Sequence, residues 1–146
     1  MITMNAKAVW VAGRQFVGES GSGHATVMDA STKDGGWGTG PSPMELLLIG
    51  MAGCTGIDVV SILEKGRQAV TGVEVVVQAE RDPEPPMVFT HIEVEYRVRG
   101  RNLSEKAVQR AIELSERKYC SASIMLGKTA NMASRYTIVD EREEGA

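Results

Sequence analysis

The sequence contains few of the residues on which metal and nucleophile chemistry usually depends. Its 146 residues include two cysteines, Cys54 and Cys120, and two histidines, His24 and His91. Two cysteines are too few for a structural zinc site unless histidines join them, and a reducing cytosol disfavours structural disulfides. By count alone, two inert core thiols are the simpler interpretation. We expect no metal and no cofactor, so any chemistry falls to the two thiols.

Basic residues and long apolar runs are also scarce. The chain has 16 Lys and Arg against 19 Asp and Glu, a net charge of -3 and a pI near 5.4. This charge argues against a nucleic-acid partner, which usually requires a basic face. Met1 to Gly13 lacks the basic start and apolar run of a secretory signal. The longest apolar region, Leu46 to Ile57, is shorter than the roughly 18 residues of a membrane helix. We therefore expect a cytoplasmic protein that does not contact a membrane.

The apolar and turn residues predict an α+β protein with one domain over residues 1–146. We expect N-terminal strands within 1–41, a central helix over 43–65, and further strands and helices within 72–140. The first strands are Lys7 to Val11 and His24 to Asp29, joined by a turn over Gly18 to Gly23. Glycines in that turn are spaced as in a phosphate loop, but a strand follows them where phosphate binding needs a helix.

The central helix has the strongest local signal. Ser42 at the N-cap, proline at the first helical position and Glu45 at the third form a capping box. Leu46 to Gly53 is apolar on every side, which predicts burial on every side. Three glycines in this helix each cost about 1 kcal/mol against alanine, so we expect another backbone to pack closely there: Gly50, Gly53 and Gly56. A homodimer that shares the core is the simplest way to cover such a helix.

The C-terminal half alternates strands and helices. Strands are predicted over Val73 to Glu80 and Val88 to Val98, and the second should turn Ile92, Val94, Tyr96 and Val98 to one face. Asn102 or Ser104 caps a helix through Lys118. A short helix over Ser121 to Leu126, a strand over Arg135 to Val139 and a frayed tail over Glu141 to Ala146 follow.

The two cysteines differ in their predicted surroundings. Cys54 lies in the central helix between small residues that leave space for a substrate, although a packed core thiol is the alternative. Asp58, four residues later, would raise its pKa, so a cation from elsewhere would be needed. Cys120 begins a short helix, whose dipole and free amides would stabilise a thiolate; the alternative is that it is only the N-terminal boundary residue of that helix. Arg14 is either that cation or a surface residue, and Glu45 is either a catalytic carboxylate or only the cap.

Three segments resemble one known family. Residues Pro43 to Cys54, Asp58 to Arg67 and Lys118 to Ser121 are similar to the OsmC/Ohr family, and closest to its YhfA-like branch. The resemblance runs in order along nearly the whole chain. It implies an OsmC-like fold, with antiparallel sheets wrapped around a long central helix in an intertwined homodimer.

The resemblance also implies an activity. Members of this family reduce organic hydroperoxides with a cysteine pair and without metal or flavin. By resemblance, Cys54 is the peroxidatic cysteine and Cys120 the resolving one, and they form a disulfide that a dithiol reductant reopens. Dihydrolipoamide, free or carried on a lipoyl protein, is the dithiol that the resemblance implies.

One position departs from the family pattern. The family's catalytic glutamate directly follows the proline, where this chain has Met44, with Glu45 one step further round the helix. The family also holds the thiolate with an arginine from the N-terminal strands, and Arg14 is the only arginine in the first 60 residues. The departure leaves two alternatives to a peroxidase: a non-catalytic protein that binds a small apolar ligand around Cys54, and a purely structural domain.

Overall fold

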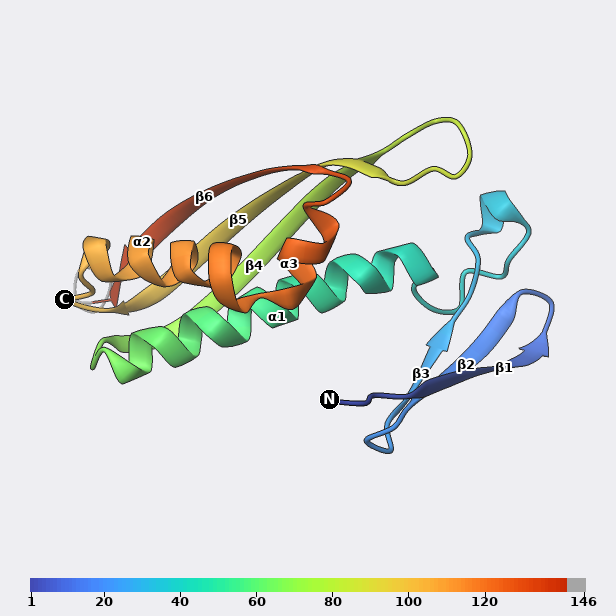
Figure 1. Cartoon of the computed structure of the whole chain (residues 1–146), viewed down its shortest axis with the longest axis horizontal. Helices are drawn as coiled ribbons and strands as arrows, with labels where there is room; N and C mark the ends of the chain where they lie inside the picture. The colour runs from blue at the N-terminus through green and yellow to red at the C-terminus, as the bar shows by residue number, and fades with distance from the viewer. Residues whose placement is uncertain (142–146) are drawn as a thin grey trace. The chain divides into compact units, whose positions relative to one another are not determined.

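The computed structural model describes residues 1–141 and shows an α+β chain (Figure 1). The chain forms two compact units divided after Leu48. The first unit contains a small sheet and the start of the long helix. The second contains the rest of that helix, a second sheet and the remaining helices. The predicted fold class is confirmed.

The sheet of the first unit has three antiparallel strands in the order β1-β2-β3. They are β1 (Ala6–Ala12), β2 (Gln15–Ser20) and β3 (Ala25–Met28). The turn between β1 and β2 places Gly13 at φ 55, a left-handed conformation that favours glycine. The predicted turn over 18–23 was too long, because its first three residues belong to β2, with Gly18 and Glu19 paired to β3.

The loop after β3 contains the turn η1 (Thr32–Asp34) and is organised by a buried carboxylate. Asp29 Oδ2 accepts hydrogen bonds from Trp37 N, Thr39 N and Thr39 Oγ1, and Oδ1 accepts one from Ala30 N. The bond from the Thr39 hydroxyl is the main cause that lowers the pKa of Asp29. A charged carboxylate therefore holds the glycine-rich loop in place.

The long helix α1 (Pro43–Lys65) begins and ends where the sequence predicts. Glu45 N donates to Ser42 Oγ at 3.1 Å, and Ser42 N donates to Glu45 Oε1 at 2.9 Å. The predicted capping box is confirmed.

The sheet of the second unit has the order β4-β5-β6. β4 (Ala69–Arg81) and β5 (Phe89–Arg101) are antiparallel, and a loop with three prolines joins them. β6 (Asn131–Asp140) runs parallel to β5, so the expectation of purely antiparallel sheets was wrong for this strand. The chain between β5 and β6 crosses the sheet through helices, and such a crossover returns the strand in the same direction.

Three helical segments make this crossover: α2 (Glu105–Leu114), η2 (Ser115–Tyr119) and α3 (Ser121–Leu126). Of the two predicted caps for α2, Ser104 is the one used, since its side chain accepts a hydrogen bond from Ala107 N. The helix continues to Tyr119 as the wider π-helical turn η2. Residues 142–146, most of the predicted frayed tail, lie outside the described residues.

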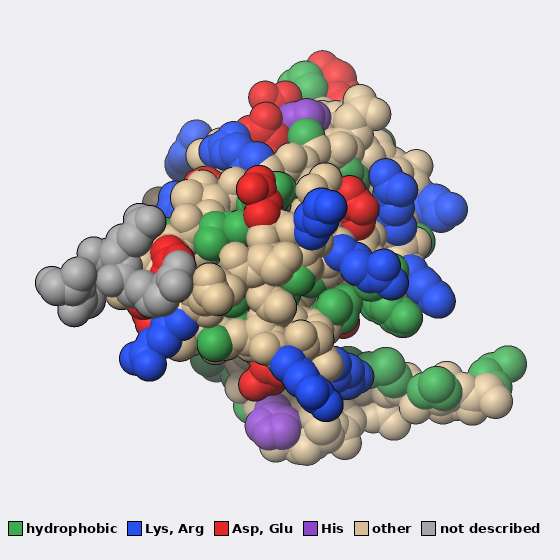
Figure 2. Space-filling model, turned by 90° about the vertical axis from the view of Figure 1, so that its left-hand side faces the viewer, with side chains coloured by type: hydrophobic (Ala, Val, Ile, Leu, Met, Phe, Trp, Pro, Cys, Tyr) green, Lys and Arg blue, Asp and Glu red, His purple; other side chains and the backbone are tan. Residues whose placement is uncertain are grey.

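Helices α1 and α2 cover one face of this sheet (Figure 1). The four side chains of β5 that the alternation predicts to share one face are all buried: Ile92, Val94, Tyr96 and Val98. The opposite face carries ion pairs, among them Arg97 with Glu74 and Glu95. Figure 2 shows one face of the molecule, on which basic and acidic side chains are interspersed.

Helix α1 is much less buried than the sequence predicts. Four of its residues, one per turn, are buried: Met51, Thr55, Val59 and Leu63. Ile57 is 72% exposed, and an added Cβ at Gly50 or Gly53 would meet nothing within 4 Å. One chain by itself therefore provides neither the burial on every side nor the closely packed backbone that the sequence predicts, and the predicted homodimer is what would have to supply them. A single chain offers only one packing face to this helix.

By length and composition, α1 would suffice to cross a membrane, although the apolar run within it is shorter than a span. Its polar residues indicate a core helix instead. Thr55 and Asp58 form hydrogen bonds with side chains of β5 and η2, and these tie the helix to the rest of the second unit.

Candidate functional site: a cysteine pair beside a carboxylate

The two cysteines, 66 residues apart in the sequence, meet in the second unit. Cys54 lies in the middle of α1, and Cys120 lies between η2 and α3. The two Sγ atoms and a carboxylate oxygen of Asp58 all lie within 4.8 Å of one another. A disulfide between them would bring the sulfurs to about 2.05 Å.

The two thiols differ in accessibility. Cys120 is completely buried, whereas Cys54 is half-buried. Gly53, next to Cys54, is exposed and lines a surface groove. Cys54 is therefore the more accessible of the two thiols.

Hydrogen bonds and burial have opposite effects on the pKa of the Cys120 thiol. Its Sγ accepts hydrogen bonds from Ser123 N at 3.3 Å and Ser123 Oγ at 3.1 Å, as expected for a residue at a helix start. Burial nevertheless raises the pKa of the Cys120 thiol; the bonds from Ser123 lower it, and the contact with Cys54 raises it further. The expectation that the helix start makes Cys120 a stabilised thiolate was wrong, because desolvation outweighs the donors.

Asp58 is oriented by a buried polar cluster that sequence reasoning missed. Ser115 Oγ donates to Asp58 Oδ2 at 2.9 Å and lies 2.7 Å from Thr55 Oγ1. Thr55 Oγ1 lies 2.9 Å from Tyr96 Oη, which donates to Glu116 Oε2 at 2.9 Å. The one sequence feature that could have indicated this cluster is Thr55, a polar residue on the buried face of an otherwise apolar helix.

The other two candidates lie in the first unit and have local partners. Arg14 is exposed in the turn after β1, and its Nη1 donates to the carbonyl of Gly13 at 3.2 Å. Glu45 is exposed in the first turn of α1, and the backbone bond from Ser42 is the main cause that lowers its pKa. Neither has a described contact with a cysteine.

Comparison with known proteins identifies relatives of this chain. The family model described as OsmC-like protein matches residues 34–134. The chain belongs to the OsmC-like family. It is 48% identical over 136 residues to the protein YhfA of Escherichia coli K12, a match that covers 93% of this chain and 98% of YhfA.

Solved structures show the same OsmC-like fold. A hypothetical protein from Aquifex aeolicus VF5 is 27% identical, with a TM-score of 0.84 over 95% of this chain and 98% of that one. An organic hydroperoxide resistance protein from Legionella pneumophila is 17% identical, with a TM-score of 0.70 over 94% and 98%. At that identity the second likeness concerns the fold alone.

A metal site is not assigned in this OsmC-like protein. Among residues 1–141, the grouping of potential donors is Cys54, Asp58 and Cys120, without histidine. The sulfur of Cys120 already accepts two hydrogen bonds, and Asp58 accepts one from Ser115. The Cys120 sulfur and the Asp58 carboxylate therefore already have hydrogen-bond partners within the protein.

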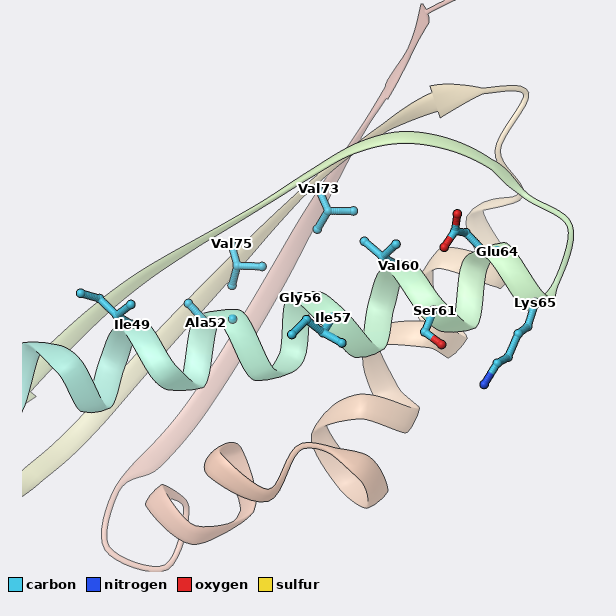
Figure 3. A pocket seen from close by; sticks show the side chains of 11 residues that line it. Ile49, Ala52, Gly56, Ile57, Val60, Ser61, Glu64, Lys65, Val73 and Val75 are labelled. Carbon is cyan, nitrogen blue, oxygen red and sulfur yellow. The ribbon is translucent and has the colours of Figure 1, made fainter. Parts of the chain in front are cut away.

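The exposed side of α1 borders an apolar groove of about 890 Å³. Figure 3 shows Val73 and Val75 of β4 on one side of the groove and Ile49 and Val60 of α1 on the other. Ile57 projects from the same helix. The groove leaves an apolar surface on the OsmC-like chain that a single copy does not cover.

The capping box gives a stability prediction that separates the structural role of Glu45 from a catalytic one. We expect Ser42→Ala to lower the free energy of unfolding by about 1 kcal/mol, because Glu45 N loses its acceptor. Glu45→Gln should change stability little, since glutamine also completes a capping box. Urea unfolding followed by circular dichroism measures both. Ser121→Ala, at an exposed serine, is the control, and an equal loss there would contradict the capping argument.

Proposed function

We propose that this protein reduces organic hydroperoxides to alcohols through Cys54 and Cys120. The observation that carries the proposal is the convergence of an accessible and a buried thiol beside Asp58, all within 4.8 Å. Membership of the OsmC-like family, with organic hydroperoxide resistance proteins among its structural neighbours, supports the same chemistry.

In the first step the Cys54 sulfur attacks the terminal peroxide oxygen. A sulfur–oxygen bond forms, the oxygen–oxygen bond breaks, and the alkoxide takes the proton that the thiol has lost. The products are a Cys54 sulfenic acid and an alcohol. The greater exposure of Cys54 supports Cys54 rather than Cys120 as the residue that takes this step.

In the second step the Cys120 sulfur attacks the Cys54 sulfenic acid. A disulfide forms, hydroxide leaves, and the proton of Cys120 converts it to water. A dithiol, dihydrolipoamide by family resemblance, then reduces the disulfide and is itself oxidised to a cyclic disulfide. The high pKa of Cys120 favours the thiol form, so a base must take its proton during the second step.

The charged partners of the first step belong to the same proposal. Arg14 is the proposed cation for the Cys54 thiolate because no other arginine occurs in the first 60 residues. Glu45 is the proposed replacement for the acid that Met44 displaces. Both assignments rest on the family resemblance.

We also propose that the working form is a cytoplasmic homodimer. The exposed apolar side of α1, with the open space beside Gly50 and Gly53, fits a second copy of the same helix. Burial of this side in a dimer would give the predicted core helix the second packing face that one chain lacks.

The central test follows the thiols of the reduced protein by mass spectrometry. One equivalent of cumene hydroperoxide should remove two hydrogens per chain and join the peptides of Cys54 and Cys120. Dihydrolipoamide should restore the original mass. A protein that keeps both free thiols after this treatment would falsify the proposal.

A further inference from the structure

A continuous chain of hydrogen bonds runs through the core of the second unit. It passes from Asp58 to Ser115, then to Thr55, to Tyr96 and to Glu116, with oxygen–oxygen distances of 2.9, 2.7, 2.9 and 2.9 Å. The three hydroxyl residues in the middle are completely buried. Both ends are carboxyl groups, and both are half-buried.

The number of hydrogens in this chain is informative. Four short contacts need four hydrogens, but the three hydroxyl groups of Ser115, Thr55 and Tyr96 supply only three. With both carboxylates charged, Ser115 donates to Asp58 and Tyr96 donates to Glu116. The single hydrogen of Thr55 can then serve only one of its two contacts, and the other brings two oxygens within 2.9 Å without a hydrogen between them. A proton on either Asp58 or Glu116 supplies the missing hydrogen and satisfies every group.

We propose that Asp58 and Glu116 share one proton through Ser115, Thr55 and Tyr96, and that this relay carries protons to and from the cysteine pair. With the proton on Asp58, each hydroxyl donates toward Glu116. With the proton on Glu116, each hydroxyl donates toward Asp58. The two states differ only by the concerted shift of four hydrogens along existing bonds.

The three hydroxyl residues in the middle of the hydrogen-bond network are suited to proton transfer. Burial raises the pKa of Tyr96 far above its usual range, Thr55 opposes this by its hydrogen bond, and Glu116 raises the pKa further. Tyr96 therefore keeps its hydrogen and passes it on rather than becoming charged. The burial of Ser115 and Thr55 also excludes water that would compete for these bonds.

The two ends of the relay have different surroundings. Asp58 lies within 4.8 Å of both sulfurs. Glu116 also accepts a hydrogen bond from Ser134 Oγ at 3.0 Å and lines a small cavity of about 70 Å³. A cavity of that size holds one or two waters. The relay thus connects the thiols with a water-accessible carboxyl.

The catalytic part of this inference rests on the proposed function. When Cys120 attacks the sulfenic acid, Asp58 in its charged state takes the proton of the Cys120 thiol. The proton then goes to the hydroxide that leaves Cys54, directly or through exchange along the relay, and water forms. This step needs no reactant beyond those already named.

Infrared spectroscopy of the reduced full-length protein at neutral pH tests the shared proton without any peroxide. We expect the carbonyl band of one protonated carboxyl group, which shifts in D₂O. Asp58→Asn and Glu116→Gln should each remove it, because the new amide donates the fourth hydrogen permanently. Glu113→Gln, at an exposed carboxylate of α2, should retain it. Absence of the band in the unmodified protein, or its persistence in either relay variant, overturns the proposal.

Stopped-flow measurement of disulfide formation from the Cys54 sulfenic acid tests the transfer of protons. Glu116→Gln touches neither sulfur, and we expect it to slow this step at least about tenfold, with partial rescue by imidazole. An unchanged rate overturns the transfer role. A protein that shows the infrared band but leaves hydroperoxides intact would keep the shared proton and reject the proposed function.

Discussion

Replacement of Cys54 by serine is expected to reduce hydroperoxide consumption at least about a thousandfold. A serine hydroxyl at neutral pH is a far weaker nucleophile than a thiol, and no other described thiol is accessible. The measurement is the loss of cumene hydroperoxide in the presence of excess dihydrolipoamide. Cys54→Ser should fold normally, because the change is nearly isosteric at a half-buried site.

Cys120→Ser is the matched control for this prediction. The buried thiol takes part only in the second step, so the variant should still consume one equivalent of hydroperoxide and then accumulate the Cys54 sulfenic acid. Dimedone labelling detects that acid by mass. If Cys54→Ser retains turnover, the cysteine pair is not the catalytic centre, and a binding or structural role becomes the better explanation.

The second large effect is expected at the exposed apolar side of α1. Ile57→Asp should weaken the proposed homodimer by at least about a hundredfold. A carboxylate buried without a partner costs several kcal/mol, and each 1.4 kcal/mol changes the dissociation constant about tenfold. Sedimentation analysis across a range of protein concentrations would follow the change from dimer to monomer.

Met125→Asp provides the control for the dimer. Met125 of α3 is as exposed as Ile57, at 72%, but it does not line the groove beside α1. The control variant should therefore dimerise like the unmodified protein. A monomeric unmodified protein, or equal dimerisation of both variants, would reject this helix as the interface.

Local patterns in the sequence were sufficient for most elements of the fold. Ser42 and Glu45 are close neighbours along the chain, so their capping box could be predicted and is present. The alternation from Ile92 to Val98 likewise identified the buried face of β5. Such features depend on residues a few positions apart, for which backbone geometry alone determines the contacts.

Features that depend on distant segments were predicted less well. The direction of β6 depends on the crossover through three helical segments, and the sequence pattern of a strand is the same in either direction. The burial predicted for α1 is only partly present in one chain, because an apolar helix face shows a need for contact but not which chain supplies it. The pKa of Cys120 depended on burial, which its helix-start position did not reveal.

By itself, the sequence indicated Cys54 and Cys120 as the residues that could carry chemistry, and the resemblance of the segments around them identified the family. Only the tertiary structure decided that the two thiols meet and that Asp58 lies beside them. It alone also revealed the chain of hydroxyl groups behind Asp58, because Thr55, Tyr96 and Ser115 come from three different elements. Each is an ordinary polar residue in the sequence, and packing in the core makes them one hydrogen-bonded network.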